Sequence, residues 1–175
     1  RQRASYTLSY KQLTHDKYKN LLKDVTSAPP AAQFNWQGSQ GYQCPALTEV
    51  VATLAKAPGT PRALNCLGEF FLAQGLDWDP LLHRPGADTL AGSQDLFAGK
   101  QRSRLDWYQQ VIANPKTDKD DKAYALYRAI NCYAPSGSNG CGSQELPFSQ
   151  RKAWFNTLKQ QHGASQWAKQ LKYYW

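Results

Sequence analysis

The chain has 175 residues, of which 41% are hydrophobic and 19% are charged, and 21 Lys and Arg against 13 Asp and Glu give a net charge of +8. These proportions exclude wholesale disorder, and the length suits one well-cored domain. No apolar run approaches the roughly 20 residues of a membrane span, so no transmembrane segment is expected in this chain.

The first 43 residues are predicted to hold one helix and a linker. Apolar residues recur with helical spacing over residues 8–25, which predicts a single amphipathic helix. Residues 26–41 contain two consecutive prolines and two glycines, which indicates a linker. We expect residues 1–43 to pack, as helix and linker, on a domain formed by residues 44–175.

Helical spacing continues through most of the remaining chain. Residues 76–100 are the exception, because prolines and glycines interrupt any long element there and predict an irregular insertion. No stretch alternates in the manner of a strand, so the predicted fold class is all-α. The further predicted helices span residues 46–57, 61–74, 101–113, 123–133, 147–161 and 165–175.

The helix over residues 61–74 has the clearest boundaries. Thr60 is a plausible N-cap, Pro61 stands in the first turn, and Gly75 is the expected stop. Gly68 lies in the middle of this helix, where glycine costs about 1 kcal/mol relative to alanine. A helix that keeps such a glycine is expected to pack closely on a neighbour there, with Phe71 filling the space one turn on.

The four cysteines are predicted to form two local disulfides. Cys132 and Cys141 bracket a turn-rich loop. Cys44 precedes Pro45 at the start of one predicted helix and Cys66 lies in the next, so a bridge between them would staple a helical hairpin. This pairing indicates an oxidising compartment, and the alternative is four buried free thiols in a cytosolic protein. No CxxC pair occurs and the three histidines are scattered, so no metal site is expected.

Two stretches of the sequence share a pattern. Residues 104–111 and 151–158 each place an aromatic pair before an aliphatic residue one turn later, and each stretch is preceded by a helix that finishes in aromatic-x-x-x-Gly. Recurring helix pairs are typical of a repeat array, in which each unit buries its apolar face on its neighbours.

On specific residues the chain resembles the tetratricopeptide-repeat (TPR) family. Leu64, Leu67-Gly68, Phe71 and Gly75 fall at the spacing of the family's first helix, while Tyr108, Val111 and Pro115 look like its second. Residues 125–133 resemble another first helix and residues 154–163 another second helix. Residues 159–174 are similar to divergent repeats of bacterial periplasmic proteins, including the outer-membrane barrel-assembly lipoprotein and the coordinator of the Tol–Pal system.

The resemblance implies antiparallel helix hairpins stacked as a short α-solenoid, interrupted by the insertion at 76–100. It implies a non-catalytic scaffold of the bacterial cell envelope that binds a protein or peptide, with no cofactor. The groove of first helices would present Asn65, Glu69, Arg128 and Asn131. Because the sequence begins without Met, we expect a processed or excised product, periplasmic or otherwise extracytoplasmic, with any membrane anchor upstream.

A cell-wall-active enzyme is the alternative function. Glu69 stands among apolar residues, and a buried carboxylate can act as the general acid of a peptidoglycan-cleaving enzyme. Helical geometry instead predicts that Glu69 points outward if Leu67 and Phe71 point inward. A second candidate pair is His83 as the base and Asp77 or Asp79 as the carboxylate that orients it. The simpler interpretation is that these are loop residues in water.

Binding of an anionic surface or polymer is the third function considered. No acidic residue follows Glu145, whereas several cations do. An anionic partner is one interpretation, and a solvated basic helix face is the other. The residues that would form this basic aromatic tail are Trp167, Lys169, Lys172, Tyr174 and Trp175.

Overall fold

The protein is described by a computed structural model that covers residues 2–27, 32–78, 97 and 99–175. Within those ranges all regular structure is helical, apart from an isolated bridge between Ser39 and Cys44, which confirms the all-α fold class. The eight α-helices are α1 (Gln2–Thr14), α2 (Tyr18–Ser27), α3 (Leu47–Lys56), α4 (Pro61–Gln74), α5 (Arg104–Ala113), α6 (Lys119–Asn131), α7 (Phe148–Gln161) and α8 (Gln166–Gln170). Short 3-10 turns cover Ala32–Phe34 and Leu76–Trp78.

The single helix predicted over residues 8–25 is wrong, because the chain turns between α1 and α2. Asp16 adopts a φ of 57°, in the left-handed region that interrupts a helix. Its carboxylate accepts hydrogen bonds from the Tyr18 hydroxyl at 2.8 Å and from Arg102 Nη1 at 3.2 Å. Arg102 is far away in the sequence, so no local pattern signals this turn.

The start of α5 and the end of α8 also differ from the prediction. Helix α5 begins at Arg104 rather than at residue 101, because Ser103 and Asp106 form a capping box. Helix α8 ends at Gln170. The prediction of a helix up to residue 175 is therefore wrong for residues 171–175, which are not helical. Lys159 Nζ donates to the carbonyl oxygens of Ala168 and Leu171, at 2.6 and 2.5 Å, and so satisfies carbonyls at this helix end.

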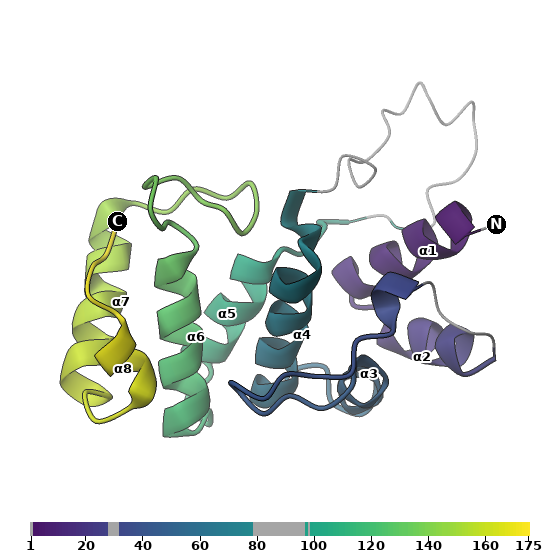
Figure 1. Ribbon diagram of the computed structural model, residues 1–175, viewed down its shortest axis with the longest axis horizontal. Coiled ribbons are helices and arrows are strands. Elements are labelled where there is room, and N and C mark those ends of the chain that lie inside the picture. The colour runs from purple at the N-terminus through teal and green to yellow at the C-terminus, as the bar shows by residue number, and fades with distance from the viewer. Residues whose placement is uncertain (1, 28–31, 79–96, 98) are drawn as a thin grey trace.

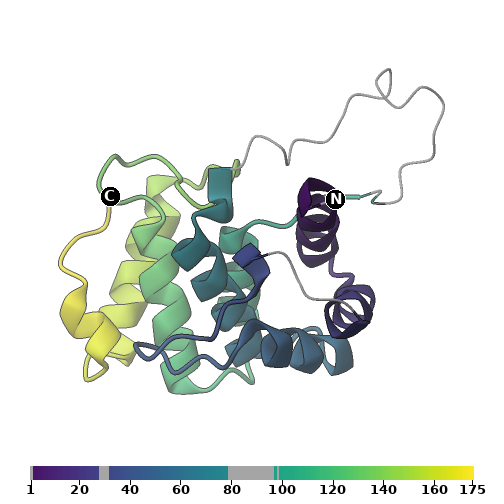
Figure 2. The same ribbon diagram turned by 45° about the vertical axis from the view of Figure 1, so that its right-hand side comes forward.

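Helix α4 forms as its sequence predicts. Pro61 is its first residue, and Gly75 closes it with a left-handed φ of 63°, donating its N–H to carbonyls of the last turn. Every residue from Ala63 to Phe71 is buried, so all sides of the helix are covered. Figures 1 and 2 show α4 in the middle of the molecule.

Consecutive helices pack side by side along the chain. Helix α2 packs on α3, α3 on α4, α4 on α5, α5 on α6, and α6 on α7. In addition, α4 contacts α6 and α6 contacts α8, so these three helices form one row, which we call the α4–α6–α8 row. None of the described helices is long and apolar enough to span a lipid bilayer.

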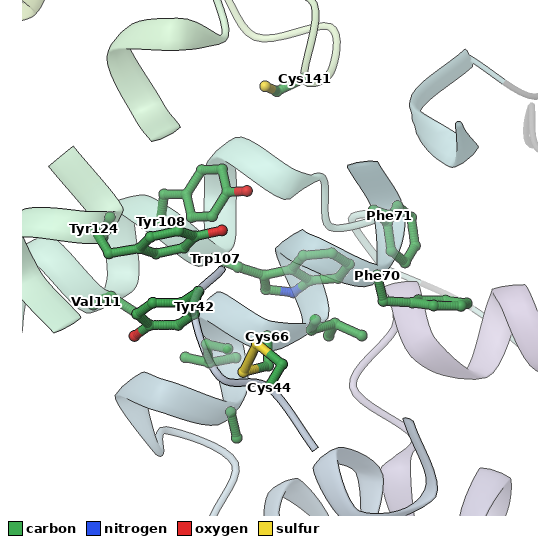
Figure 3. Close-up of a cluster of buried hydrophobic side chains, with 14 of the residues drawn as sticks. Tyr42, Cys44, Cys66, Phe70, Phe71, Trp107, Tyr108, Val111, Tyr124 and Cys141 are labelled. Carbon is green, nitrogen blue, oxygen red and sulfur yellow. A yellow bond between two sulfur atoms is a disulfide. The ribbon is translucent and has the colours of Figure 1, made fainter. Parts of the chain in front are cut away.

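One hydrophobic core connects the ends of this arrangement, reaching from Leu13 in α1 to Leu171 after α8. Its centre is aromatic. The Phe71 ring meets Trp107 edge-on with centroids 4.7 Å apart (Figure 3). It also lies 5.5 Å from the Tyr10 ring. Such pairs add about 0.5–1.5 kcal/mol beyond area burial. The N-terminal helices therefore share the core of the other helices.

Candidate functional site

Polar side chains meet where α4 faces α6. Asn65 and Glu69 are one turn apart on α4, and Asp121, Tyr124 and Arg128 lie at helical spacing on α6. The 39–44 segment, which we call the tyrosine segment after Tyr42, lies against both helices through the bonds described below.

Glu69 is the anchor of one half of this site. Its Oε1 accepts hydrogen bonds from the Tyr124 hydroxyl and from Arg128 Nη2, the latter at 2.6 Å. Its Oε2 accepts from Ser39 Oγ at 3.4 Å. Only 9% of Glu69 is exposed, so the outward orientation expected from helical geometry is wrong. The expectation assumed a helix covered on one face, whereas α4 is covered by α3, α5, α6 and the tyrosine segment.

Tyr42 is the centre of the other half. Its hydroxyl donates to Asp121 Oδ1 and accepts from Asn65 Nδ2 at 2.9 Å. Arg62 Nη1 donates to the main-chain carbonyl of Tyr42 at 3.1 Å, and Arg62 Nη2 forms an ion pair with Asp121 Oδ1 at 3.0 Å. Both the side chain and the backbone of Tyr42 are therefore bound by the helices.

The Tyr42 ring is held between a cation and a second ring. It stacks on Tyr124 with centroids 3.7 Å apart and planes inclined by 10°, and the Arg62 guanidinium lies 4.6 Å from its centroid. Trp167 of α8 meets Tyr124 edge-on at 4.9 Å. The close-up in Figure 3 shows Tyr42 and Tyr124 lying next to each other. Stacking and cation–π contacts thus complement the hydrogen bonds.

Burial sets the protonation of these groups. It raises the pKa of Tyr42 and of Tyr124 well above the ordinary tyrosine value, so both hydroxyls stay neutral and can donate. Burial also raises the pKa of Asp121, although the Tyr42 hydrogen bond and the Arg62 charge oppose this shift. The site is thus a network of neutral donors and paired charges.

Covalent and backbone constraints hold the tyrosine segment in place. Cys44 forms a disulfide with Cys66 of α4, with the two Cα atoms 5.5 Å apart, and the second disulfide joins Cys132 and Cys141. These are the two pairs that the sequence predicts. Gly38 has a φ of 97°, and a β-carbon there would collide with the carbonyl oxygen of Cys44.

The structure brings together three of the four groove residues named from the sequence. Asn65, Glu69 and Arg128 belong to this network, but Asn65 and Glu69 bind the tyrosine segment of the same chain and Arg128 binds Glu69. Asn131 lies one turn beyond Arg128 and donates to the carbonyl oxygen of Tyr127 at 2.8 Å. The tyrosine segment lies over this part of α4 and α6 and takes up the hydrogen bonds of Asn65 and Glu69.

Sequence reasoning missed the residues that complete the network. Neither Tyr42 nor Asp121 stands out in the sequence as a binding residue. Arg62 and Tyr124 carry no local signal, since Arg62 binds Tyr42 across 20 residues and Tyr124 binds Glu69 across 55 residues.

The carboxylates proposed for catalysis are engaged in structural contacts. Both oxygens of Glu69 accept hydrogen bonds, and Asp77 forms a buried ion pair with Arg104, with Nη2–Oδ2 at 2.8 Å. A general acid needs a protonated oxygen that faces its substrate. His83 and Asp79 lie outside the described residues. Within the described ranges, no three His, Cys, Asp or Glu side chains gather in a way that could hold a metal ion.

The basic aromatic tail is divided between core and surface. Trp167 is buried against Tyr124, whereas Tyr174 and Trp175 are half-buried. Lys169 and Lys172 are exposed. Trp167 is therefore part of the core between α6 and α8 and offers no stacking face to an external ligand.

Comparison of the chain with protein-family models, with curated proteins and with solved structures finds no match. Function must therefore be inferred from the residues and their geometry.

Proposed function

We propose that this chain is a non-catalytic scaffold domain of the bacterial cell envelope that binds an extended peptide segment of a protein partner. The binding surface would be the part of the α4–α6–α8 row that the tyrosine segment leaves uncovered. The proposal is carried by one observation, the way α4 and α6 hold the tyrosine segment. Arg62 donates to a main-chain carbonyl, and Asn65 and Asp121 bind the hydroxyl of an aromatic side chain. Recognition of an extended peptide uses the same combination of backbone hydrogen bonds and a side-chain site.

The packing order of the helices supports a TPR-like solenoid. Each of α2 to α7 packs on its neighbour in the chain, and contacts also join α4 to α6 and α6 to α8. In such an array the first helices of successive pairs line one surface. The two disulfides support an oxidising, extracytoplasmic location.

The part of the row that remains accessible lies on α6, beyond the tyrosine segment. Tyr127, Arg128 and Asn131 are each half-buried there. The Arg128 guanidinium lies 5.4 Å from the centroids of both the Tyr124 and the Tyr127 ring. These two aromatic contacts fix the orientation of the Arg128 side chain. Arg128 already pairs with Glu69 through Nη2, so an acidic residue of the peptide would share this guanidinium with Glu69.

The enzyme alternative has less support from the geometry. Glu69 is tied to Tyr124, Arg128 and Ser39, which accounts for its burial without a substrate. Its removal is thus expected to reduce stability rather than to abolish a reaction.

Selection of displayed peptides on the immobilised protein tests the proposal. Enriched peptides are expected to be extended and acidic, and Asn131→Glu should weaken their binding about tenfold by placing a like charge at the rim. The control is Lys56→Glu, an exposed change on α3 that should leave affinity unchanged. Peptides that bind the Asn131→Glu protein as tightly as the parent would contradict the proposed surface. Glu69-dependent cleavage of added peptidoglycan would favour the enzyme instead.

A further inference from the structure

The C-terminal part of the chain carries positive charge that no acidic side chain offsets. After Glu145 the sequence contains no Asp or Glu, whereas it contains Arg151, Lys152, Lys159, Lys169 and Lys172. These residues lie on α7, on α8 and in the segment that follows α8, at one end of the helix array (Figure 1).

Two of these cations are used inside the protein. Arg151 is buried, lies 4.2 Å from the Tyr133 ring centroid, and donates to the carbonyl oxygens of Gly137 and Trp175. Lys159 binds the carbonyls at the end of α8. The remaining three, Lys152, Lys169 and Lys172, are exposed and form no ion pair with any residue in the described ranges.

Exposed aromatic rings occur in the same two segments as these lysines, α7 and the residues after α8. Phe148 is 52% exposed and Tyr173 is 66% exposed, although both are large apolar side chains. Tyr174 packs on Phe148 with ring centroids 5.2 Å apart, which joins the C-terminal segment to the N-terminal turn of α7. Lys152 follows Phe148 by one helical turn and so shares its face of α7. Lys172 directly precedes Tyr173 in the chain, and both are exposed. We call Phe148, Lys152, Lys172, Tyr173 and Tyr174 the end face.

The chemistry of the end face selects one kind of partner. Its exposed cations are all lysines, whose flexible stems suit a mobile layer of headgroups, whereas fixed bidentate phosphate recognition generally uses arginine. The only arginine of this region, Arg151, is buried. Phe148 has no polar atom, so its exposed ring gains most from a boundary with hydrocarbon.

We propose that the end face binds the surface of a membrane that contains anionic phospholipids. The rings of Phe148 and Tyr173 would enter the boundary between headgroups and acyl chains. Lys152 and Lys172 would lie among the phosphates, with their stems along the apolar boundary. This contact uses α7 and the C-terminal segment, and so leaves the α6 surface proposed for peptide binding free.

Co-sedimentation of the full chain with vesicles tests the proposal. Vesicles of phosphatidylglycerol and phosphatidylcholine, mixed equally, are compared with vesicles of phosphatidylcholine alone. The protein is expected to bind the mixed vesicles. Its affinity should fall as the salt concentration is raised from about 0.05 to about 0.5 M, because the Debye length shortens over this range and screens the lysine charges. Each neutralised lysine should weaken binding about fivefold, so Lys152→Gln with Lys172→Gln should weaken it about 25-fold.

Two further variants separate the end face from general charge attraction. Lys19→Gln with Lys23→Gln removes the same charge from exposed positions on α2 and should change affinity less than twofold. Phe148→Ser with Tyr173→Ser keeps the charge and should weaken binding about tenfold, since ring burial is lost. Equal losses in the two lysine variants would overturn the proposal. Equal binding to both kinds of vesicle, or no effect of the aromatic variant, would overturn it as well, as would tighter binding to soluble polyphosphate or nucleic acid.

Discussion

Gly68 lies directly against the ring of Tyr108. A β-carbon on Gly68 would fall 2.6 Å from both Cε1 and the hydroxyl oxygen of Tyr108, closer than real side-chain contacts allow. Tyr108 is fully buried on α5, so its ring has nowhere to move. The glycine therefore sets the distance at which α4 and α5 approach.

Gly68→Ala is expected to destabilise the protein. The gain of about 1 kcal/mol in helix propensity is outweighed by overpacking, which costs typically 1–3 kcal/mol and more where a rigid buried ring must shift. Urea unfolding measures the difference. The control is Gly41→Ala, since a β-carbon at Gly41 meets nothing within 4 Å. If Gly68→Ala proved more stable than the parent, the close packing of α4 on α5 would be refuted.

Phe71→Ala is expected to lower the free energy of unfolding by about 3–5 kcal/mol, because it leaves a large cavity in the core. The Phe71 side chain is 1% exposed and lies between Trp107 and Tyr10. Its neighbour Leu72 is 39% exposed, and Leu72→Ala should change stability by about 0.5 kcal/mol or less. Similar losses in both variants would contradict the orientation of α4.

Glu69→Ala is expected to cost about 3 kcal/mol, because it leaves Arg128 and Tyr124 without their shared acceptor. The Glu69 side chain is 11% exposed and the Arg128 side chain 22%, so the pair is only partly screened by water. A double-mutant cycle with Arg128→Ala should give a clear coupling energy. Lys100→Ala, which breaks an ion pair whose lysine is 70% exposed, should cost less than about 1 kcal/mol. Additive losses at positions 69 and 128 would rule out the ion pair.

Replacing Cys44 and Cys66 by alanine is expected to lower stability by about 3 kcal/mol, because the unfolded chain gains loop entropy. It should also weaken the near-ultraviolet circular dichroism of the stacked Tyr42 and Tyr124 rings, since the disulfide holds the tyrosine segment. The matched control replaces Cys132 and Cys141, which should lower stability while leaving that signal intact. Mass spectrometry of the unreduced protein checks the pairing directly, and free thiols or a different bridge would exclude it.

His162 is expected to titrate below the ordinary histidine value. Burial lowers its pKa from 6.5, and the charges of Lys122 and Lys119 lower it further. The folded pKa is thus below the unfolded one, so the unfolded chain binds more protons as the pH falls, and stability falls with it through this window. The His162→Gln protein should lose less stability than the parent between pH 7 and pH 5.

Nuclear magnetic resonance can follow the His162 ring directly. Its titration midpoint should lie below 6.5 in the parent and should rise in Lys122→Gln. A midpoint at or above 6.5 would show that the ring is solvated in the folded protein.

The parts of the fold that depend on nearby residues could be predicted from the sequence. Pro61 and Gly75 mark the ends of α4 by their own backbone preferences, and the all-α class follows from helical spacing. The close packing at Gly68 could be predicted as well. A glycine in the middle of a helix lowers the stability of that helix, and the close approach of a neighbouring helix explains why it is present. The two disulfides pair cysteines that are at most 22 residues apart.

The parts that depend on distant residues could not be predicted. The turn at Asp16 is held by Arg102, and the burial of Glu69 depends on Tyr124 and Arg128 across another helix. A helical wheel describes one helix against one surface, whereas α4 is enclosed on all sides. The site was therefore recognised in part, through Asn65, Glu69 and Arg128, without the segment that covers it.

The tyrosine segment has a consequence for the order in which the chain acquires its structure. Tyr42 is bound by Asp121, which follows it by 79 residues, although α3, α4 and α5 all lie between them in the chain. During synthesis, which proceeds from the N-terminus, Tyr42 emerges long before its partner. An array held only by contacts between neighbouring helices can grow one helix at a time. In this chain α4 cannot make all of its contacts until α6 has emerged. The first half of the fold is therefore completed only after the second half has been synthesised.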